Sequence, residues 1–382
     1  MRRLLLLASA IVFVDTMFFA AVVPLLPRLS DDFELSKTAA GILSGAYAAG
    51  TLTASVPAGL LASRVGVRPT VYTGLGLLSA SGIVFATAND IVLLDAARFV
   101  QGVGGACSWA GALGWLIGAA PLDRRGELIG SAMAAAIGGV LFGPVLGGLA
   151  VGLGRGPVFG AVALLGLGLI ALTRQLPAPR ATVTRSARDN LAAVARAPGL
   201  RVGLPLILIP GLLFGAIDVL VPLRLDDLGA TAGAIAAVFV VAALTEAAVN
   251  PIAGRISDRY GRIMPSKVGL ATSAVAALLL ILPDSTWVLG VIVIAAAPAI
   301  GVLWSPAIAL LSDGAESAGV DQGMAFGFVN LGWALGHTLG STAGPGLAEL
   351  TSDAVTYALL AAICAVAFAT LMLRDPLPEP AA

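Results

Sequence analysis

The stretch GSAMAAAIGGVLFGPVLGG, residues 130–148, decides what kind of fold this chain can adopt. It has no charged residue, and it carries six glycines and one proline. In a helix exposed to water, each internal Gly costs about 1 kcal/mol and each Pro about 3 kcal/mol relative to Ala. In a bilayer, neighbouring helices satisfy the freed backbone groups, and small residues let two helix backbones approach closely. The stretch therefore predicts a membrane helix that packs tightly against a neighbouring helix.

The overall composition also favours a membrane protein. Of the 382 residues, 58% are hydrophobic and 12% are charged, and the mean hydropathy is +0.97. A water-soluble core cannot bury so much apolar surface, so we predict a polytopic membrane protein. The net charge is zero, so a nucleic-acid partner is not expected. Both cysteines, Cys107 and Cys364, fall in apolar runs, and we expect no disulfide, metal site or cofactor.

The apolar runs predict the number of membrane crossings. A bilayer core about 30 Å thick needs about 20 helical residues per crossing. We therefore predict an all-α membrane protein with a six-helix bundle in 1–173, a basic cytoplasmic linker in 174–201, and a second six-helix bundle with a short cytoplasmic tail in 202–382. The twelve predicted spans are 4–26, 39–62, 70–88, 91–119, 127–149, 157–173, 202–223, 233–253, 263–282, 287–311, 324–347 and 355–373.

The basic residues predict the orientation of these spans. Seventeen of the 22 lysines and arginines fall in loops on the side of the N-terminus, four fall on the other side, and Arg98 lies within a span. Cytoplasmic loops carry an excess of Lys and Arg, so both termini are expected in the cytoplasm. The preference for Arg over Lys, with abundant Ala and Gly, favours a bacterial inner membrane.

Three short motifs recur at nearly constant offsets of 195, 198 and 201 residues. The loop 59–68 recurs as 254–262, the triplet 23–25 as 221–223, and Gly139-x3-Gly143-Pro144 as Gly340-x3-Gly344-Pro345. An internal duplication with six spans per half is the prediction, and the two bundles should be pseudo-symmetric.

The same motifs resemble those of a known family. The loops 59–68 and 254–262 and the segment Arg98-x2-Gln101-Gly102 resemble signatures of the major facilitator superfamily over essentially the whole chain. Within it, residues 15–27 and the glycine-rich stretch 130–148 are similar to those of the twelve-span drug/proton antiporters, and especially to their vesicular amine transporter branch. The resemblance implies two bundles around a central cavity and a transporter rather than an enzyme.

The sequence departs from that branch at four positions. Ser63 stands where the family usually has an acid or Asn, and Tyr47 stands where the branch carries a lysine. Gly301 and Asn330 stand where the branch carries acids. These differences argue against an amine as the substrate and against the proton stoichiometry of that branch.

Ionisable residues inside the predicted spans are the candidates for proton coupling. A charged group at the bilayer centre costs about 3 kcal/mol or more, so it usually faces a cavity or a partner. Asp15 lies about 16 Å along its helix, near the membrane centre. We expect Asp15, Asp218, Glu246 and Arg98 to couple protons, with packing alone as the alternative for Asp15 and solvation at the outer interface for Asp218.

Further polar and aromatic side chains could bind the substrate. Arg98 either forms a structural ion pair with Asp95 or switches towards Asp15, and the single histidine either packs or binds protons or ligand. The predicted substrate-binding residues are Asp15, Tyr47, Gln101, Asp218, Glu246, Asn250, Trp304, Asn330, Trp333 and His337.

The repeated loops and the glycine-rich span are the predicted moving parts. Asp258 lies just beyond a span, where it could meet a helix N-terminus or an arginine of the other half and hold the inner gate shut. The predicted gating residues are Arg64, Gly143, Pro144, Asp258, Arg259 and Arg262.

Together these features predict a monomeric exporter of a small amphipathic or cationic compound that works in exchange for protons. A sugar or metabolite transporter on the same fold, or a membrane receptor that does not transport, are the alternatives. An enzyme is not expected, because a chain with one histidine offers no Ser/His/Asp or metal arrangement.

Overall fold

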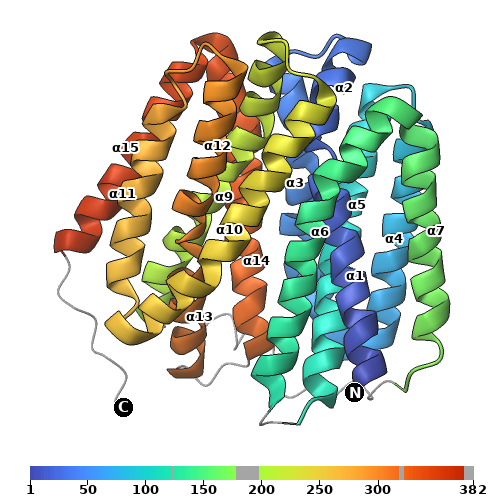
Figure 1. Ribbon diagram of the computed structural model, residues 1–382. Coiled ribbons are helices and arrows are strands. Elements are labelled where there is room, and N and C mark those ends of the chain that lie inside the picture. The colour runs from blue at the N-terminus through green and yellow to red at the C-terminus, as the bar shows by residue number, and fades with distance from the viewer. Residues whose placement is uncertain (122–123, 178–197, 318–321, 374–382) are drawn as a thin grey trace.

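The computed structural model describes residues 1–121, 124–177, 198–317 and 322–373, which form helices and no strand (Figure 1). The elements are α1 (Arg2–Ala20), η1 (Val23–Leu25), α2 (Leu26–Phe33), α3 (Lys37–Arg64), α4 (Val67–Thr87), α5 (Ile91–Ala119), α6 (Arg125–Leu153), α7 (Arg155–Thr173), α9 (Pro198–Asp227), α10 (Ala232–Tyr260), α11 (Ile263–Leu279), α12 (Thr286–Gly301), α13 (Trp304–Ser317), α14 (Gln322–Leu350) and α15 (Asp353–Leu373).

Among the described residues, ten helical segments are long and apolar enough to cross a membrane, which confirms the predicted all-α membrane fold. The count of twelve spans stays a prediction, because α11 is shorter than these ten and α14 is not among them. Most of the predicted linker, 178–197, lies outside the described residues.

Two of the predicted spans are interrupted. The first one breaks after α1 because Pro24 has no N–H group to continue the helix, and the chain passes through η1 into α2. The predicted span 287–311 consists of α12 and α13, with a break at Val302 and Leu303. Both breaks place helix ends inside the bundle, where their backbone groups need partners.

The repeated loop motif has the same backbone in both halves. Gly66 connects α3 to α4 with φ of 116°, and Gly261 connects α10 to α11 with φ of 81°. A side chain is unfavourable at such φ values, which explains the glycine at both positions. The two loops support the internal duplication inferred from the sequence.

Each half has its own hydrophobic core. One core is built from α1, η1 and α2–α7, and the other from α9–α15, and the two bundles lie side by side in Figure 1. The cores meet where η1 and α9 approach each other, because Val23 joins the second core and Val219 joins the first. The chain therefore has the two-bundle architecture that the repeats predict.

The glycines of residues 130–148 allow the close helix packing that the sequence predicts. A Cβ atom at Gly139 or Gly143 would overlap atoms of α1, and one at Gly147 would overlap Ala21 and Pro24 just after it. The repeat in the second half behaves alike, since a Cβ atom at Gly336 or Gly340 would overlap the backbone of α9. Two equivalent helix pairs, α1 with α6 and α9 with α14, thus pack at backbone contact.

The two ends of the bundle differ in charge. We call the end where α1 begins and α3 ends the basic end, and the opposite end, where α2 ends and α3 begins, the acidic end (Figure 1). Loops and helix ends of the basic end carry Arg64, Arg68, Arg255, Arg259 and Arg262. Those of the acidic end carry Asp31, Asp32, Glu34, Asp226, Asp227 and Asp284.

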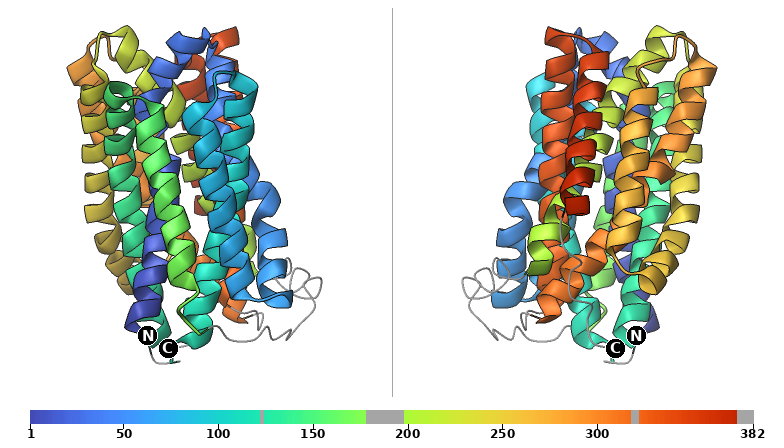
Figure 2. Two further views of the ribbon diagram at one scale, coloured as in Figure 1. Left: turned by 90° about the vertical axis from the view of Figure 1, so that its right-hand side faces the viewer. Right: turned by 90° about the vertical axis from the view of Figure 1, so that its left-hand side faces the viewer.

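The two halves are joined at the acidic end. Helices of opposite halves lie beside each other in two places, α3 with α14 and α6 with α10 (Figure 2). Lys37 Nζ lies 2.5 Å from Asp353 Oδ1, and the backbone N–H of Thr38 donates to Glu349 Oε2 at 2.8 Å. A Cβ atom at Gly41 would overlap the backbone of α14. These contacts hold α3 and α14 together where α3 begins.

Candidate functional site

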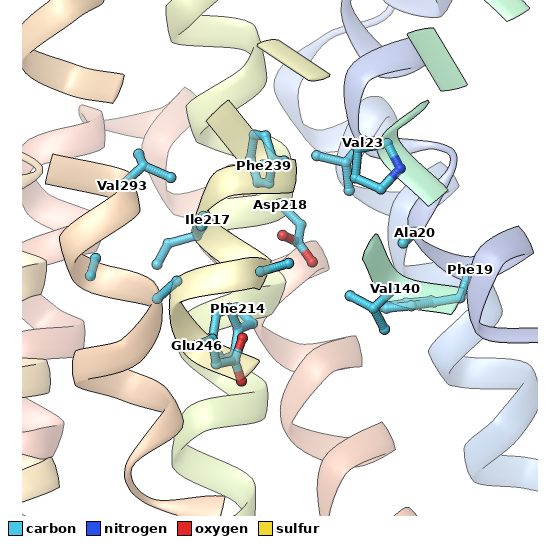
Figure 3. A pocket seen from close by; sticks show the side chains of 15 residues that line it. Phe19, Ala20, Val23, Val140, Phe214, Ile217, Asp218, Phe239, Glu246 and Val293 are labelled. Atoms are coloured by element: carbon cyan, nitrogen blue, oxygen red, sulfur yellow. The ribbon is translucent and has the colours of Figure 1, made fainter. Parts of the chain in front are cut away.

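A cavity lies between the two halves, walled by α1 and α6 on one side and by α9, α10 and α12 on the other (Figure 3). Its volume is about 80 Å³. Most of its lining is apolar or aromatic, and its two charged groups are Asp218 and Glu246. Pro144, a predicted gating residue, also lines it, directly after the glycine that packs on α1.

Asp218 is held by the only histidine of the chain. His337 Nε2 lies 3.3 Å from Asp218 Oδ2, and the side chains are 1% and 15% exposed, so the pair is almost fully withdrawn from solvent. The imidazole packs against Phe19 and Trp333, with ring centroids 5.1 Å and 5.5 Å away. The structure thus brings three predicted substrate-binding residues, Asp218, Trp333 and His337, together, and of these Asp218 lines the cavity.

Glu246 has a tryptophan as its hydrogen-bond donor. Trp304 Nε1 donates to Glu246 Oε1 at 3.1 Å, and the indole stacks on Phe214 at a centroid distance of 6.5 Å and an interplanar angle of 4°. A Cβ atom at Gly301 would lie 2.5 Å from Glu246 Cγ. Gly301 stands where the amine transporter branch carries an acid. In this chain the absence of a side chain there leaves room for Glu246 of the neighbouring helix α10.

The predicted amide residues are less close to the cavity. Asn250 lies one helical turn from Glu246, its Oδ1 is buried without a hydrogen-bond partner among the described residues, and its carbonyl accepts from Ser305 Oγ at 3.2 Å. Asn330 is half-buried on α14 and does not line the cavity.

Among the described residues, no group of three or more His, Cys, Asp or Glu side chains could hold a metal ion.

Asp15 is buried beneath two aromatic donors. Its exposure is 1%, Tyr47 Oη lies 2.8 Å from each carboxyl oxygen, and Trp109 Nε1 donates to Oδ2 at 2.7 Å. A Cβ atom at Gly105 would lie 2.5 Å from Tyr47 Oη and 2.7 Å from Asp15 Oδ1. Sequence reasoning missed Trp109 and Gly105, although their spacing of four residues places them on one helix face.

The cavity does not reach Asp15. In the described part of the chain, the lining includes Asp218 and Glu246 but neither Asp15 nor Tyr47. Asp15 therefore lies in a separate polar pocket of the first half.

Arg98 binds the broken end of α1 and does not pair with Asp95. Its Nη1 donates to Phe18 O at 3.2 Å and to Gln101 Oε1 at 3.0 Å, and its Nη2 donates to Phe19 O at 3.3 Å. These carbonyls belong to the last turn of α1, whose carbonyl groups lack helical partners. Of the two alternatives given for Arg98, the ion pair with Asp95 is thus wrong, because the break in α1 offers Arg98 two nearby acceptors.

Arg98 also connects to the pocket of Asp15. Its guanidinium lies over the ring of Tyr47, 5.1 Å from the centroid. Gln101, predicted to bind substrate, is fully buried and binds this arginine instead of lining the cavity. Asp95 keeps one buried carboxyl oxygen without a partner among the described residues.

The predicted gate at Asp258 does not bridge the two halves. Asp258 pairs with Arg262 of the same half, and Arg262 also lies 3.4 Å from Asp313 Oδ2. The arginine of the other half, one of the two partners expected for Asp258, is therefore not the one that the structure shows: Arg262 follows Asp258 by four residues, just past the end of α10, and pairs with it. Arg259 lies over the ring of Tyr260, and Arg64 is exposed at the end of α3.

Comparisons with known proteins identify relatives. The sequence model of the Major Facilitator Superfamily matches residues 8–320 and 206–382. The MFS-type transporter ppzB of Metarhizium rileyi is 31% identical over 142 residues, 36% of this chain and 29% of that protein. Tetracycline resistance protein, class E, of Escherichia coli is 29% identical over 174 residues, 44% of this chain and 43% of that protein. The synaptic vesicular amine transporter of Homo sapiens is 32% identical over 123 residues, 32% of this chain and 21% of that protein. Each match spans less than half of the relative's length.

Proposed function

Because the chain belongs to the Major Facilitator Superfamily, we propose that it is a proton-coupled secondary transporter that exports a small amphipathic or cationic compound. The observation that carries this proposal is the pair of carboxyl groups, Asp218 and Glu246, on the wall of an apolar cavity between the two halves. Relatives named for tetracycline, multidrug and quinolone resistance are consistent with export of such compounds.

The chemistry of the cavity favours a cation with an apolar body. Carboxyl groups at membrane depth attract a cation, and aromatic rings such as those of Phe19, Phe214 and Phe239 on the cavity wall stabilise positive charge nearby. Apolar side chains form most of the remaining wall and suit a hydrocarbon or aromatic substituent. A neutral sugar would need more hydrogen-bonding side chains than this wall offers.

Transport requires the cavity to widen. Pockets that hold drug-sized ligands have volumes of about 300 Å³ or more, which exceeds the present cavity of about 80 Å³. The halves are joined at the acidic end through Lys37 and Asp353, so we propose that substrate enters from the basic end. By the charge rule for membrane loops, the basic end faces the cytoplasm of a bacterial inner-membrane protein.

Protons are proposed to act through the buried acids. Desolvation favours the protonated form of a carboxyl group, and a nearby cation favours the ionised form. A carboxyl group whose surroundings alternate between these conditions takes up and releases a proton in each cycle. Asp15 would carry the proton, while Asp218 and Glu246 would bind the cation.

Proteoliposomes that contain a pH-sensitive dye test this function. We expect tetraphenylphosphonium to drive proton movement, whereas spermidine should be a poorer substrate and glucose should have no effect. Asp15→Asn should abolish the coupling, and Asp95→Asn, which changes a carboxyl group outside the cavity, should preserve it. Uphill export that continues in Asp15→Asn would remove this residue from its role. Accumulation of glucose would favour a sugar transporter, and binding without accumulation would favour a receptor.

A further inference from the structure

Phe19 lies between the cavity and the pocket of Asp15. It reaches the cavity wall from the last turn of α1 (Figure 3). On its other side its ring packs against Tyr47, with centroids 5.1 Å apart and an interplanar angle of 47°. Tyr47 is 3% exposed and donates to the carboxyl group of Asp15. A ligand in the cavity would therefore touch Phe19, and Phe19 touches the donor that covers Asp15.

Phe19 also contacts the second half directly. Its ring lies edge-on to Trp333 at 5.3 Å and to His337 at 5.1 Å. His337 in turn holds Asp218 at 3.3 Å. One phenyl ring thus contacts both the Tyr47 that covers Asp15 and the His337 that holds an acid of the cavity.

The backbone of Phe19 lies where α1 can change shape. α1 ends at Ala20, before the break at Pro24, and the carbonyl of Phe19 is held by Arg98 at 3.3 Å instead of by a helical partner. A side chain at such a helix end can rotate or shift without breaking a regular helix. The position therefore combines a helix end with contacts on three sides.

We propose that Phe19 is a lid between the cavity and Asp15, and that a cation in the cavity displaces its ring and lets Asp15 lose its proton. The displacement of the ring by a cation rests on the proposed transport function. When the ring moves, Tyr47 is free to turn, and water from the widened cavity reaches the carboxyl group. The O–H bond of the acid breaks, the proton passes to water, and a carboxylate remains.

The charged and titratable groups around this step are few. Tyr47 and Trp109 face the carboxyl group, Arg98 lies over the Tyr47 ring, and His337 and Asp218 lie beyond Phe19. The carboxylate is thus formed near a fixed cation, which stabilises it. Phe19 is a positioning residue here, since it covers the proton-carrying group without exchanging a proton.

Labelling with dicyclohexylcarbodiimide tests the lid directly. This apolar reagent reacts with protonated carboxyl groups and leaves a stable N-acylurea, which mass spectrometry locates on the peptide that contains Asp15. In the purified full-length protein at acidic pH, where the carboxyl group stays protonated even when the ring has moved, we expect slow labelling of Asp15 that tetraphenylphosphonium accelerates. In Phe19→Ala the labelling should be about two- to tenfold faster without ligand, the factor that loss of one aromatic pair predicts. It should then no longer respond to tetraphenylphosphonium.

Three variants serve as controls. Phe13→Ala removes a phenyl ring from the same helix that pairs with Phe142 at 5.7 Å, and it should label like the wild type. Phe19→Tyr keeps the ring and should restore slow labelling. Glu246, on the cavity wall, provides a reference for reagent that enters the cavity. Equal Asp15 labelling in Phe19→Ala and wild type would overturn the lid. Faster labelling of Asp15 in Trp109→Phe but not in Phe19→Ala would also overturn the lid, because the reagent would then reach Asp15 past Trp109.

The lid and the transport function can fail separately. If wild-type protein moves protons with tetraphenylphosphonium but Phe19→Ala labels like wild type, the lid is wrong and the function stands. If Phe19→Ala labels faster but the cation neither moves protons nor accelerates labelling in the wild type, Phe19 covers Asp15 and the coupling to a cation is wrong.

Discussion

The substitution Gly105→Ala is a direct test of how Asp15 is held. The added Cβ atom would lie 2.5 Å from Tyr47 Oη and 2.7 Å from Asp15 Oδ1, closer than such atoms can approach. Tyr47 would have to shift away from the carboxyl group, and a buried polar group left without its partner costs about 1–3 kcal/mol. Alanine in place of glycine returns about 1 kcal/mol of helix propensity. We therefore expect a small net loss of stability together with altered proton coupling.

A matched control separates the cost of the lost hydrogen bond from the gain in helix propensity. Gly114 lies on the same helix, and a Cβ atom there would meet only Val67 Cγ1 at 3.5 Å, an ordinary contact. Gly114→Ala should gain the helix propensity without disturbing any hydrogen bond. The free energies of unfolding of the two variants should therefore differ by about 1–3 kcal/mol, the cost of the unsatisfied polar group alone.

Equilibrium unfolding in mixed micelles, followed by circular dichroism, measures this difference. Proteoliposome assays with tetraphenylphosphonium measure the coupling of the same two variants. We expect Gly105→Ala to weaken substrate-driven proton movement and Gly114→Ala to leave it intact. Equal stability and equal coupling in the two variants would refute the assigned packing of Gly105 against Tyr47 and Asp15.

Three further changes test the rest of the site. Gly301→Ala should displace Glu246, whose Cγ would lie 2.5 Å from the new Cβ, and weaken tetraphenylphosphonium binding in equilibrium dialysis. Asp218→Asn should weaken the same binding and preserve slow carbodiimide labelling of the first-half acid; unchanged affinity would contradict its role. In a double-mutant cycle, Lys37→Met and Asp353→Asn should show a coupling of about 0.5–1 kcal/mol, typical of a partly exposed pair. This coupling should fall as salt is raised, and a salt-independent value would contradict an ion pair.

Local sequence patterns predicted the parts of the fold that depend on local packing. Gly139 and Gly143 recur four residues apart, so they share a helix face and predict a close helix contact, which the structure places against α1. Gly66 and Gly261 occupy matching positions of the repeated loop and share a positive φ. Each of these features depends on spacing within one helix or one turn, and a sequence displays such spacing directly.

The partners of the buried charges could not be predicted in the same way. Arg98 and Asp95 are three residues apart on a helix, and this spacing favoured a local ion pair. The structure instead gives Arg98 the carbonyls of Phe18 and Phe19, which are about 80 residues away in the chain. Those acceptors exist only because α1 breaks before Pro24, so the choice depends on a helix end in another part of the fold.

The acids of the two halves have different surroundings, and this difference constrains any exchange cycle. Asp15 is enclosed by aromatic donors, whereas Asp218 and Glu246 line the cavity. A cation that binds the cavity acids would not displace the proton of Asp15 by direct competition, because the two groups do not share a surface. Coupling between them requires a part that contacts both, and Phe19 meets that condition through Tyr47 on one side and His337 on the other. On the proposed function, proton release therefore depends on the movement of one ring at the end of α1 rather than on contact between the cation and Asp15.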